Sequence, residues 1–408
     1  MLTGLAEAEE QRVLSIEIIG LERTDERTVI RQLPFVVGDI WQDDFAPTGE
    51  RWLRNLGIFS EAHISRPDER GHVSIHLRER WSLWVLPTFS RKDTGASSAG
   101  VTVDEYNLWG LNHHLRLAGR EDTGKNFSTA NGSSYAVAYD WRRIADSKLS
   151  ISAATDWGRS SFDAYKNGVQ VAQYAQDGRS VSLMLSYGFG PVPGEGLSVS
   201  AGFSGSNSSF ALLSGLAQPD VIGNRKRTVI GGISYQNVNN EITWFSGTAY
   251  DYSLAVSHKA LGSTINVYRQ SLSIRSYVPF DDHNTINLRL NAGLVSGDVL
   301  RDGLFDIGNR TGIRGYYPGE VQGKSYVYGT VEGRYLLSPE SNVQLVAFSD
   351  VGLVRGGSAF QGKTFFAGMG GGIRWTLRWL VNGTIRGDAA YGFASRRWRF
   401  YLGSGQAF

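Results

Sequence analysis

Hydrophobic and polar residues alternate along most of the chain, from about residue 81 to the end. In TINLRLNAGLV, Ile286, Leu288 and Leu290 share one face of an extended strand, while Asn287 and Arg289 lie on the other. Similar segments occur near 81–91, 97–109, 112–121, 132–142, 147–158, 178–189, 195–205, 226–238, 243–256, 261–277, 283–297, 324–337, 342–354, 365–378, 381–392 and 398–408. One such strand would also fit a soluble β-sandwich, but sixteen of them with polar loops are typical of a transmembrane barrel. We therefore predict a mainly β protein with a sixteen-stranded antiparallel transmembrane β-barrel at 81–408.

Residues 13–80 have a different pattern, in which helical and extended periods both occur. VLSIEIIG reads as a strand, and TDERTVIRQL reads as a helix capped by Thr24 or Asp25. A second helix is predicted in DDFAPTGERWLRNLG, where Trp52 and Leu53 share the apolar face and Gly57 stands at the end. IFSEAHIS and HVSIHLRER then read as two strands. The pattern predicts one small α+β (βααββ) domain at 13–80, preceded by a tail at 1–12.

Composition and motifs exclude several classes of function. The chain of 408 residues carries 41 Lys+Arg against 39 Asp+Glu, so no nucleic-acid partner is predicted. Its apolar residues never form a run long enough for a transmembrane helix. There is no cysteine, and the seven histidines have no acids at ligand spacing, so we predict no metal and no other cofactor. No G-x-S-x-G, H-E-x-x-H or P-loop motif occurs, which predicts that the chain is not an enzyme.

The predicted loop at about 298–324 contains the stretch TGIRGYYPGE. Its IRGY motif, which comprises Ile313, Arg314, Gly315 and Tyr316, follows the small α+β domain in the chain and lies between the eleventh and twelfth strands. This arrangement resembles the bacterial outer-membrane insertase and two-partner-secretion superfamily of BamA-, TamA- and TpsB-like proteins. The domain at 13–80 looks like a single POTRA domain, with LRNLGIF and the earlier GD as its matching stretches. The resemblance implies that the loop folds back into the barrel lumen, where its arginine meets acids on the wall.

Parity along the strands indicates which wall residues meet this loop. Glu332 in VYGTVEGRYLL and Asp350 in VQLVAFSDVGLV both fall on the predicted inner face. The resemblance supports both residues, because an acid follows the loop in that family and FSDVG matches its F-x-D-x-G motif. We expect the two acids to accept hydrogen bonds from Arg314 that a lysine could not copy. Gly370 and Gly372 in FFAGMGGGIRWTLR also have inward parity and are predicted to leave a groove for the loop.

The first and last predicted strands are expected to meet at a weak seam. Pro87 in WSLWVLPTFSR cannot donate to a strand ladder, so it marks an edge or a bulge, or alternatively ends a short strand at the rim. Gly403 in RRWRFYLGSGQAF would loosen the partner strand. The aromatic end at Phe408 resembles the terminal signal of outer-membrane barrels, although Gln406 stands where an aromatic residue is usual.

Taken together, the resemblance implies a barrel in the outer membrane of a Gram-negative bacterium that inserts or exports unfolded polypeptides. The POTRA domain would lie in the periplasm and bind these polypeptides along a strand edge. Outer-membrane lipids and a periplasmic or upstream domain are the other expected partners. Two alternatives remain: the barrel portion of a patatin-type lipase whose catalytic domain lies upstream, and a TpsB-type secretion pore. MLTGLAEAEE lacks the features of a signal peptide, so we expect either a removed signal or a longer protein cut at this point.

Overall fold

The N-terminal part of the chain forms a small three-stranded domain. The structure, a computed structural model, describes residues 11–91, 97–123, 132–166, 169–338, 340–357 and 364–404. The small domain comprises β1 (Ser15–Ile19), α1 (Glu26–Ile30), α2 (Phe45–Asn55), β2 (Phe59–Ile64) and β3 (His72–Glu79). The central strand, β3, is parallel to β1 and antiparallel to β2. The order of strands and helices is the one that the sequence pattern predicted.

Local sequence signals account for the helices of this domain. The Asp25 carboxylate caps α1 by accepting a hydrogen bond from the Arg27 backbone N–H at 2.9 Å. α2 ends before Gly57, which has a φ of +77°. Its Leu53 is fully buried and packs with Val73 in the core of the domain. None of the helices in the described ranges is both long and apolar enough to cross a membrane.

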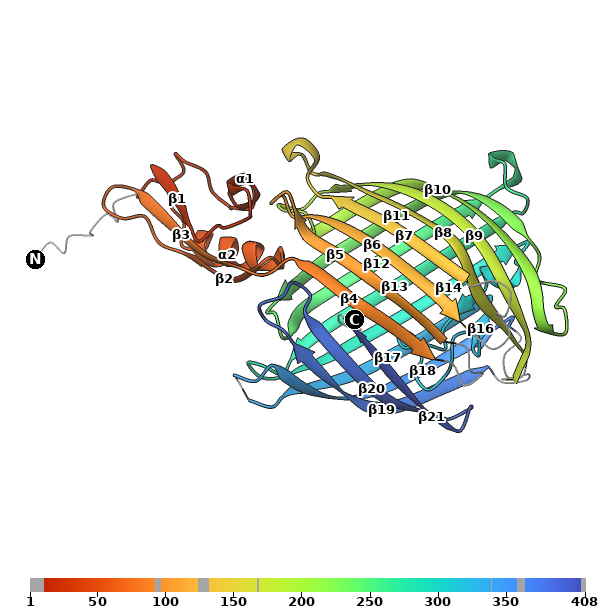
Figure 1. Ribbon diagram of the computed structural model, residues 1–408. Coiled ribbons are helices and arrows are strands. Elements are labelled where there is room, and N and C mark those ends of the chain that lie inside the picture. Colours follow the sequence, from red (N-terminus) through yellow and green to blue (C-terminus); the bar gives the residue numbers. More distant parts are fainter. Residues whose placement is uncertain are drawn as a thin grey trace, which may run out of the picture.

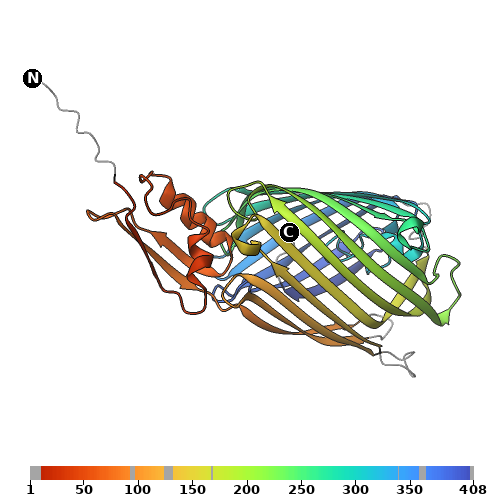
Figure 2. The ribbon, with the colours of Figure 1, turned by 90° about the horizontal axis from the view of Figure 1, so that it is seen from above.

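Sixteen strands form the second and larger sheet. They are β4 (Leu83–Arg91), β5 (Ser97–Leu108), β6 (His113–Thr123), β7 (Gly132–Trp141), β8 (Leu149–Lys166), β9 (Val169–Gly188), β10 (Gly196–Gly215), β11 (Asn224–Asn240), β12 (Phe245–Ser257), β13 (Val267–Pro279), β14 (Thr285–Gly297), β17 (Ser325–Leu336), β18 (Val343–Arg355), β19 (Phe365–Thr376), β20 (Thr384–Gly392) and β21 (Arg397–Ser404). Each strand pairs antiparallel with its neighbour in this order, and β14 pairs with β17 across the loop. The sheet curves around on itself, with the small domain at one end (Figures 1 and 2). The predicted set of sixteen antiparallel strands is confirmed.

The two faces of this sheet differ in chemistry. On β18, Gln344 and Asp350 are fully buried on the inner face, whereas the outward residues Leu345 and Val351 are each 45% exposed. Outward Met369 and Ile373 on β19 are likewise exposed. Exposed apolar residues outside and polar residues inside are the reverse of a soluble sandwich, and they match a barrel surrounded by lipid.

Three strands are much longer than the sequence pattern predicted. β8 has 18 residues, and β9 and β10 have 20 each, so all three continue beyond the predicted segments at 147–158, 178–189 and 195–205. The additional parts lie at the end of the barrel opposite the small domain (Figure 1). They lack clean alternation because a strand that projects from a membrane has no lipid on its outer face. In these three strands the alternation of apolar and polar residues therefore stops before the strand ends.

The sheet has two terminal strands within the described residues. β4 pairs only with β5, and β21 pairs only with β20. On β21 the outward residues Phe400 and Leu402 are 81% and 83% exposed, far more than outward residues in the middle of the sheet. The predicted seam therefore lies between strands that have a partner on one side only.

Candidate functional site: the lumen loop and the seam

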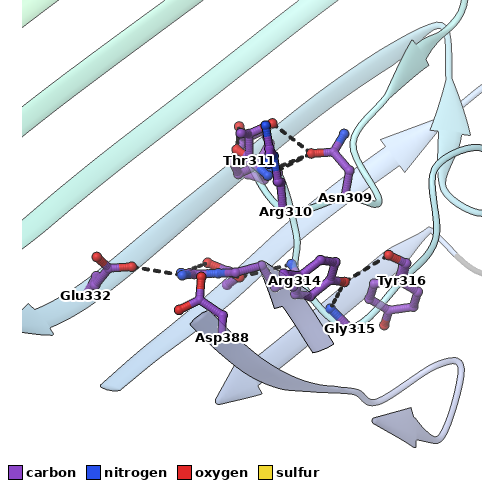
Figure 3. A network of polar contacts seen from close by, with 12 residues as sticks. Asn309, Arg310, Thr311, Arg314, Gly315, Tyr316, Glu332 and Asp388 are labelled. Carbon is purple, nitrogen blue, oxygen red and sulfur yellow. Dashed lines mark hydrogen bonds and ion pairs between the residues drawn. The ribbon is translucent and has the colours of Figure 1, made fainter. Parts of the chain in front are cut away.

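The loop between β14 and β17 has structure of its own. It contains a short 3-10 helix, Arg301–Gly303, and two paired two-residue strands, β15 (Phe305–Asp306) and β16 (Gln322–Gly323). Between β15 and β16 the chain makes a tip that carries the IRGY motif and lies against the inner face of β17 to β21 (Figure 3). This inward course is the one that the resemblance implied.

Arg314 at the tip makes the contacts expected with both wall acids. Its Nε and Nη2 donate to the two carboxylate oxygens of Asp350 at 2.8 and 3.0 Å. Its backbone N–H also donates to Asp350, at 3.0 Å, and its Nη1 donates to Glu332 at 2.8 Å (Figure 3). The guanidinium carbon lies 3.3 Å from the centre of the Phe348 ring. Only a planar group with several donors can satisfy all of these partners at once.

Two further arginines extend this network along the wall. Glu332 also accepts hydrogen bonds from Arg334 Nε at 2.9 Å and from Arg374 Nη2 at 3.4 Å. Arg374 in turn donates from Nη1 to Asp388 at 2.6 Å. Three arginines, counting Arg314, thus face three carboxylates, so the network has no net charge. Asp388 was not predicted as a residue of this site. Its inward parity on β20 was the signal in the sequence that could have indicated it.

The network is buried, which changes its energetics. All six charged side chains, including Asp350 and Asp388, are at most 4% exposed. If water reached these ion pairs, removal of one partner would cost about as much as for an exposed pair, about 0 to 1 kcal/mol. For a buried pair, removal of one partner leaves an uncompensated charge and costs about 3 to 5 kcal/mol. Loss of one partner in this buried network is therefore expected to cost more than the loss of a partner in an exposed ion pair.

Glycines allow the loop backbone to approach the wall. Gly315 has a φ of +100°, and a Cβ there would lie 2.4 Å from the backbone nitrogen of Gly392 on β20. A Cβ on Gly368 of β19 would lie 1.9 Å from the Arg314 carbonyl oxygen. Substitution of either glycine must therefore displace the loop.

The groove predicted at Gly370 and Gly372 is not where the loop backbone lies closest. A Cβ on Gly370 would first meet Ala389 and the Phe348 ring, and one on Gly372 would first meet Asp388. These nearest neighbours belong to the wall strands. The two glycines thus make room for wall side chains, and Gly368, one pleat away, makes room for the loop. Gly368, Gly370 and Gly372 all have inward parity, so the sequence pattern could not show which of them the loop approaches.

Aromatic hydroxyl groups connect the tip to the last strand. Tyr401 of β21 accepts a hydrogen bond from the Gly315 N–H and donates to the Tyr316 carbonyl, both at 2.9 Å (Figure 3). The Tyr316 hydroxyl donates to the Ala367 carbonyl at 2.9 Å. Ile313, fully buried, packs in an apolar cluster with Tyr316 and other loop and wall residues. The tip is therefore attached to β21, the strand at the seam.

The three seam residues predicted from sequence have different positions. Pro87 lies inside β4, which continues to Arg91, so the alternative that Pro87 ends a short strand is wrong. Gly403 pairs with Arg386 on β20, and a Cβ on it would lie 2.6 Å from the Arg310 guanidinium of the loop. Gly403 thus accommodates the loop at the seam. Phe408 lies outside the described residues.

A turn between β19 and β20 bridges to the start of β4. Trp81 N–H donates to the Trp379 carbonyl at 2.7 Å, and the Trp84 indole donates to the Val381 carbonyl at 2.5 Å. Arg80 donates to two carbonyls of the turn, including that of Leu380 at 2.5 Å, and burial lowers its pKa to about 10. We call residues 377–383 the seam turn. It connects β20, the neighbour of β21, directly to β4.

The seam turn also packs into the small domain. Val381 is 3% exposed and belongs to the same apolar core as Val29, Phe35 and Leu53. Three parts of the molecule therefore meet at this turn: the small domain, the first strand and the second-last strand. Nothing in the sequence pattern indicated this contact, because residues 80 and 380 are separated by three hundred positions.

His114 has acidic neighbours in space that the spacing along the sequence did not show. His114 at the start of β6 lies between two acids, with its Nε2 2.7 Å from Asp104 and its Nδ1 3.3 Å from Asp140. The sequence had shown no acid at a suitable spacing, because these acids are on neighbouring strands. The three side chains are linked by hydrogen bonds, and Arg116 also donates to Asp104 at 2.7 Å.

Comparison with known proteins identifies the family. The Omp85 superfamily domain matches residues 107–408, which include the loop, the charged network and the last strand. The chain belongs to the Omp85 superfamily. This membership makes it an outer-membrane β-barrel and confirms the resemblance inferred from the IRGY motif.

A curated relative and several solved structures are similar over nearly the whole chain. The outer membrane protein assembly factor BamA of Neorickettsia risticii (strain Illinois) is 22% identical over 93% of this chain, which spans about half (52%) of the relative's length. CdiB from Escherichia coli has a TM-score of 0.64 at 15% identity, covering 97% of this chain and 74% of that one. CdiB from Acinetobacter baumannii has a TM-score of 0.60 at 18% identity, covering 95% and 72%. BamA from Haemophilus ducreyi lacking POTRA domains 1–3 has a TM-score of 0.56 at 13% identity, covering 96% and 83%. At these identities the structures support the fold.

Proposed function

We propose that this protein moves unfolded polypeptides into or across the outer membrane. The small domain would bind them in the periplasm, and the barrel would pass them through its lumen or its seam. Membership of the Omp85 superfamily supports this class of function. The observation that carries the proposal is the attachment of the loop tip, because Arg314 is bonded to β18 and Gly315 to Tyr401 of β21. A displacement of the last strand must therefore disturb the loop, and the reverse also holds.

The unit at 13–80 would act as a POTRA domain that precedes a barrel at 81–408. Both β1 and β2 are edge strands of its sheet, so each leaves backbone N–H and C=O groups unpaired on one side. Such an edge binds an extended polypeptide through its backbone and therefore suits clients of many sequences. Removal of residues 13–79 leaves Arg80 and its contacts with the seam turn in place. We expect this deletion to abolish client assembly or secretion while the barrel still inserts, as judged by heat-modifiable migration. Undiminished activity of the deletion variant would contradict this role.

The seam between β4 and β21 would be the lateral opening. The strong exposure of Phe400 and Leu402 and the single neighbours of both strands support this location. Trp81, which stands just before β4, and Leu380 of the seam turn form an isolated parallel bridge. The chain has no cysteine, so the pair Trp81→Cys and Leu380→Cys would give a single, unambiguous disulfide. Transport that stops on oxidation and returns with a reductant would support an opening in which the start of β4 separates from the seam turn, whereas full transport in the crosslinked protein would contradict such an opening.

Insertion and export are two forms of this proposal. The similarity to BamA suggests an assembly factor, and the similarity to CdiB suggests a secretion pore of the TpsB type. The same matches favour either form over the barrel portion of a patatin-type lipase. Reconstitution of the full chain in liposomes separates the two forms. An insertase would place an added unfolded barrel protein in the bilayer, whereas a pore would deliver an added soluble passenger to the lumen of the vesicle.

A further inference from the structure

Three arginines lie on the outward face of β9 and β11, the two strands on either side of β10, toward the end of the barrel opposite the small domain. Asn207 of β10 pairs with Arg179 of β9 on one side and with Arg225 of β11 on the other. Arg227 follows on the same face of β11 and pairs with Gly205. Adjacent strands are 4.7–4.9 Å apart, so the Cα atoms of Arg179 and Arg225 are separated by about 10 Å. We call Arg179, Arg225 and Arg227 the outer arginine cluster.

Neighbouring side chains establish that this face is the outward one. Val181 and Leu183 on β9, Phe203 on β10 and Val229 on β11 have the same parity as the cluster. All four are exposed apolar residues, as expected for contact with lipid chains. The arginines therefore lie on the same face of the sheet as apolar residues whose exposure is explained by contact with lipid.

The cluster lies at the border of this apolar surface. From Val181 the outward residues of β9 remain apolar through Leu183 and Leu185 to Tyr187. With Arg179, this stretch has about the nine to eleven residues that a tilted strand needs to cross a bilayer. On the other side of the border, outward Arg159 of β8 and Asp177 of β9 form an ion pair at 2.8 Å. The cluster is thus at the level where lipid headgroups lie.

The arginines retain donors for a ligand. Arg225 donates from Nε to the Gly262 carbonyl at 2.9 Å. Arg227 uses only Nη1, which lies 2.9 Å from the Lys226 carbonyl, 3.2 Å from the Ser206 carbonyl and 3.3 Å from Asn207 Oδ1. Arg179 is exposed and has no ion-pair or hydrogen-bond partner among the described side chains. Each guanidinium has five N–H donors, so all three side chains keep donors beyond these contacts. Asp177 is paired with Arg159, which leaves the positive charge of the cluster uncompensated on this face.

We infer that the outer arginine cluster binds the phosphate groups of a phosphorylated lipid in the outer leaflet. Guanidinium groups bind phosphate through paired, charge-assisted hydrogen bonds. Headgroups that carry several phosphates fit a row of arginines spaced across three strands, and their acyl chains would lie on Phe203 and Val229 below. The site would hold the lipid against β9 to β11, far along the sheet from the seam. The inference rests on the proposed orientation, with the small domain in the periplasm.

The test measures retained lipid and does not depend on clients. The full chain is reconstituted in phosphatidylcholine nanodiscs with a small fraction of diphosphoryl lipid A, and the lipid A that remains bound after release is counted by native mass spectrometry. The variant Arg179→Gln/Arg225→Gln/Arg227→Gln should retain at least about tenfold less lipid A, since each arginine at a charged membrane surface contributes about fivefold. Monophosphoryl lipid A should be retained less well than the diphosphoryl form. Heat-modifiable migration shows whether each variant is folded.

A charge-neutral control removes a nearby arginine on the same face. The variant Arg159→Gln/Asp177→Asn deletes the ion pair on the other side of the border and should retain lipid A as the unchanged chain does. Equal retention by the triple variant, or equal retention of phosphatidylcholine and lipid A, would overturn the inference. Binding of inorganic phosphate at millimolar concentration without lipid would instead identify a site for soluble anions. A protein that retains lipid A but handles no client would refute the proposed function and leave this inference intact.

Discussion

The lumen has two unlike walls. The charged wall, on β17 to β20, carries Glu332, Asp350, Arg374 and Asp388, which are almost completely buried around the tip of the loop. The serine wall, on β10 to β13, carries Ser200, Ser234, Ser253, Ser271 and Ser273, which are only partly buried and line a concavity in the barrel. Both walls are polar, as the inner face of a membrane barrel requires. Of these two walls, the charged wall is the one that binds Arg314 of the loop tip.

The difference between the walls shows how access to water decides what a polar residue does. On the charged wall each charge is withdrawn from water and must have a partner, so the arrangement of side chains fixes one position for the loop. On the serine wall each hydroxyl can exchange hydrogen bonds with water, so no single neighbour is required. The charged wall therefore fixes the position of Arg314, whereas the serine wall is a surface of small polar residues that stay partly exposed.

Removal of Arg314 should have the largest effect. Arg314→Ala leaves Asp350 buried without its guanidinium partner and removes one of the three arginines that donate to Glu332, which should destabilise the loop position by about 3 to 5 kcal/mol. The barrel should still fold and insert, while client assembly or secretion falls. Labelling of the loop at Thr311→Cys, in this cysteine-free chain, measures the release of the tip.

Asp350→Ala should have much the same effect, and the two changes should not add. Two of the three hydrogen bonds between Arg314 and Asp350 come from the guanidinium, and either substitution removes both of them, so the double variant loses these contacts only once. Full additivity in a double-mutant cycle would mean that the two side chains act independently, and the charged wall would then not be a single unit.

A smaller but still clear effect is expected from Gly368→Ala. The new Cβ would lie 1.9 Å from the Arg314 carbonyl, so the loop must shift at a cost of about 1 to 3 kcal/mol. Gly231→Ala on β11 is the matched control, because a Cβ there would meet nothing within 4 Å. Thr311→Cys labelling should rise in the first variant only. If both variants label alike, the close approach at Gly368 does not position the loop.

Trp84→Phe should have a modest effect at the seam. It removes the indole hydrogen bond to the Val381 carbonyl and keeps the ring, for a loss of about 0.5 to 1.5 kcal/mol. Urea unfolding of the small domain, followed by proteolysis, should begin at a slightly lower concentration. The charged wall should be unaffected, so labelling at Thr311→Cys should not change. An increase in that labelling would show that the seam turn and the loop are coupled.

The smallest effect is expected on the serine wall. Ser253→Ala removes one hydroxyl from a surface that water reaches, and its effect on stability should stay within about 0.5 kcal/mol. Client transport should also be unchanged, as measured beside Arg314→Ala. A loss comparable to that of Arg314→Ala would mean that this wall binds a partner specifically, and the contrast between the walls would fail.

Some of this arrangement could be predicted because it depends on local periodicity. Alternation located the strands, and parity placed Glu332 and Asp350 on the inner face before any fold was known. It could not identify Asp388 as a member of the network or choose Gly368 over Gly370, because these depend on which strands lie beside the loop. The extended parts of β8 to β10 were missed because they have water on their outer face and so lose the pattern.

The sequence by itself determined the class of the protein: a small α+β unit, sixteen strands with an apolar outer face, and an IRGY loop before the twelfth strand. These features follow from apolar residues that recur every two or about every 3.6 positions. Such a period is visible in a short stretch of sequence and does not depend on distant residues. The tertiary structure decided the rest. It brought Tyr401 to the tip of the loop, placed Val381 in the core of the small domain and aligned Arg179 with Arg225 across β10. Such contacts depend on strand register and on packing between residues that are hundreds of positions apart, and no local pattern encodes them.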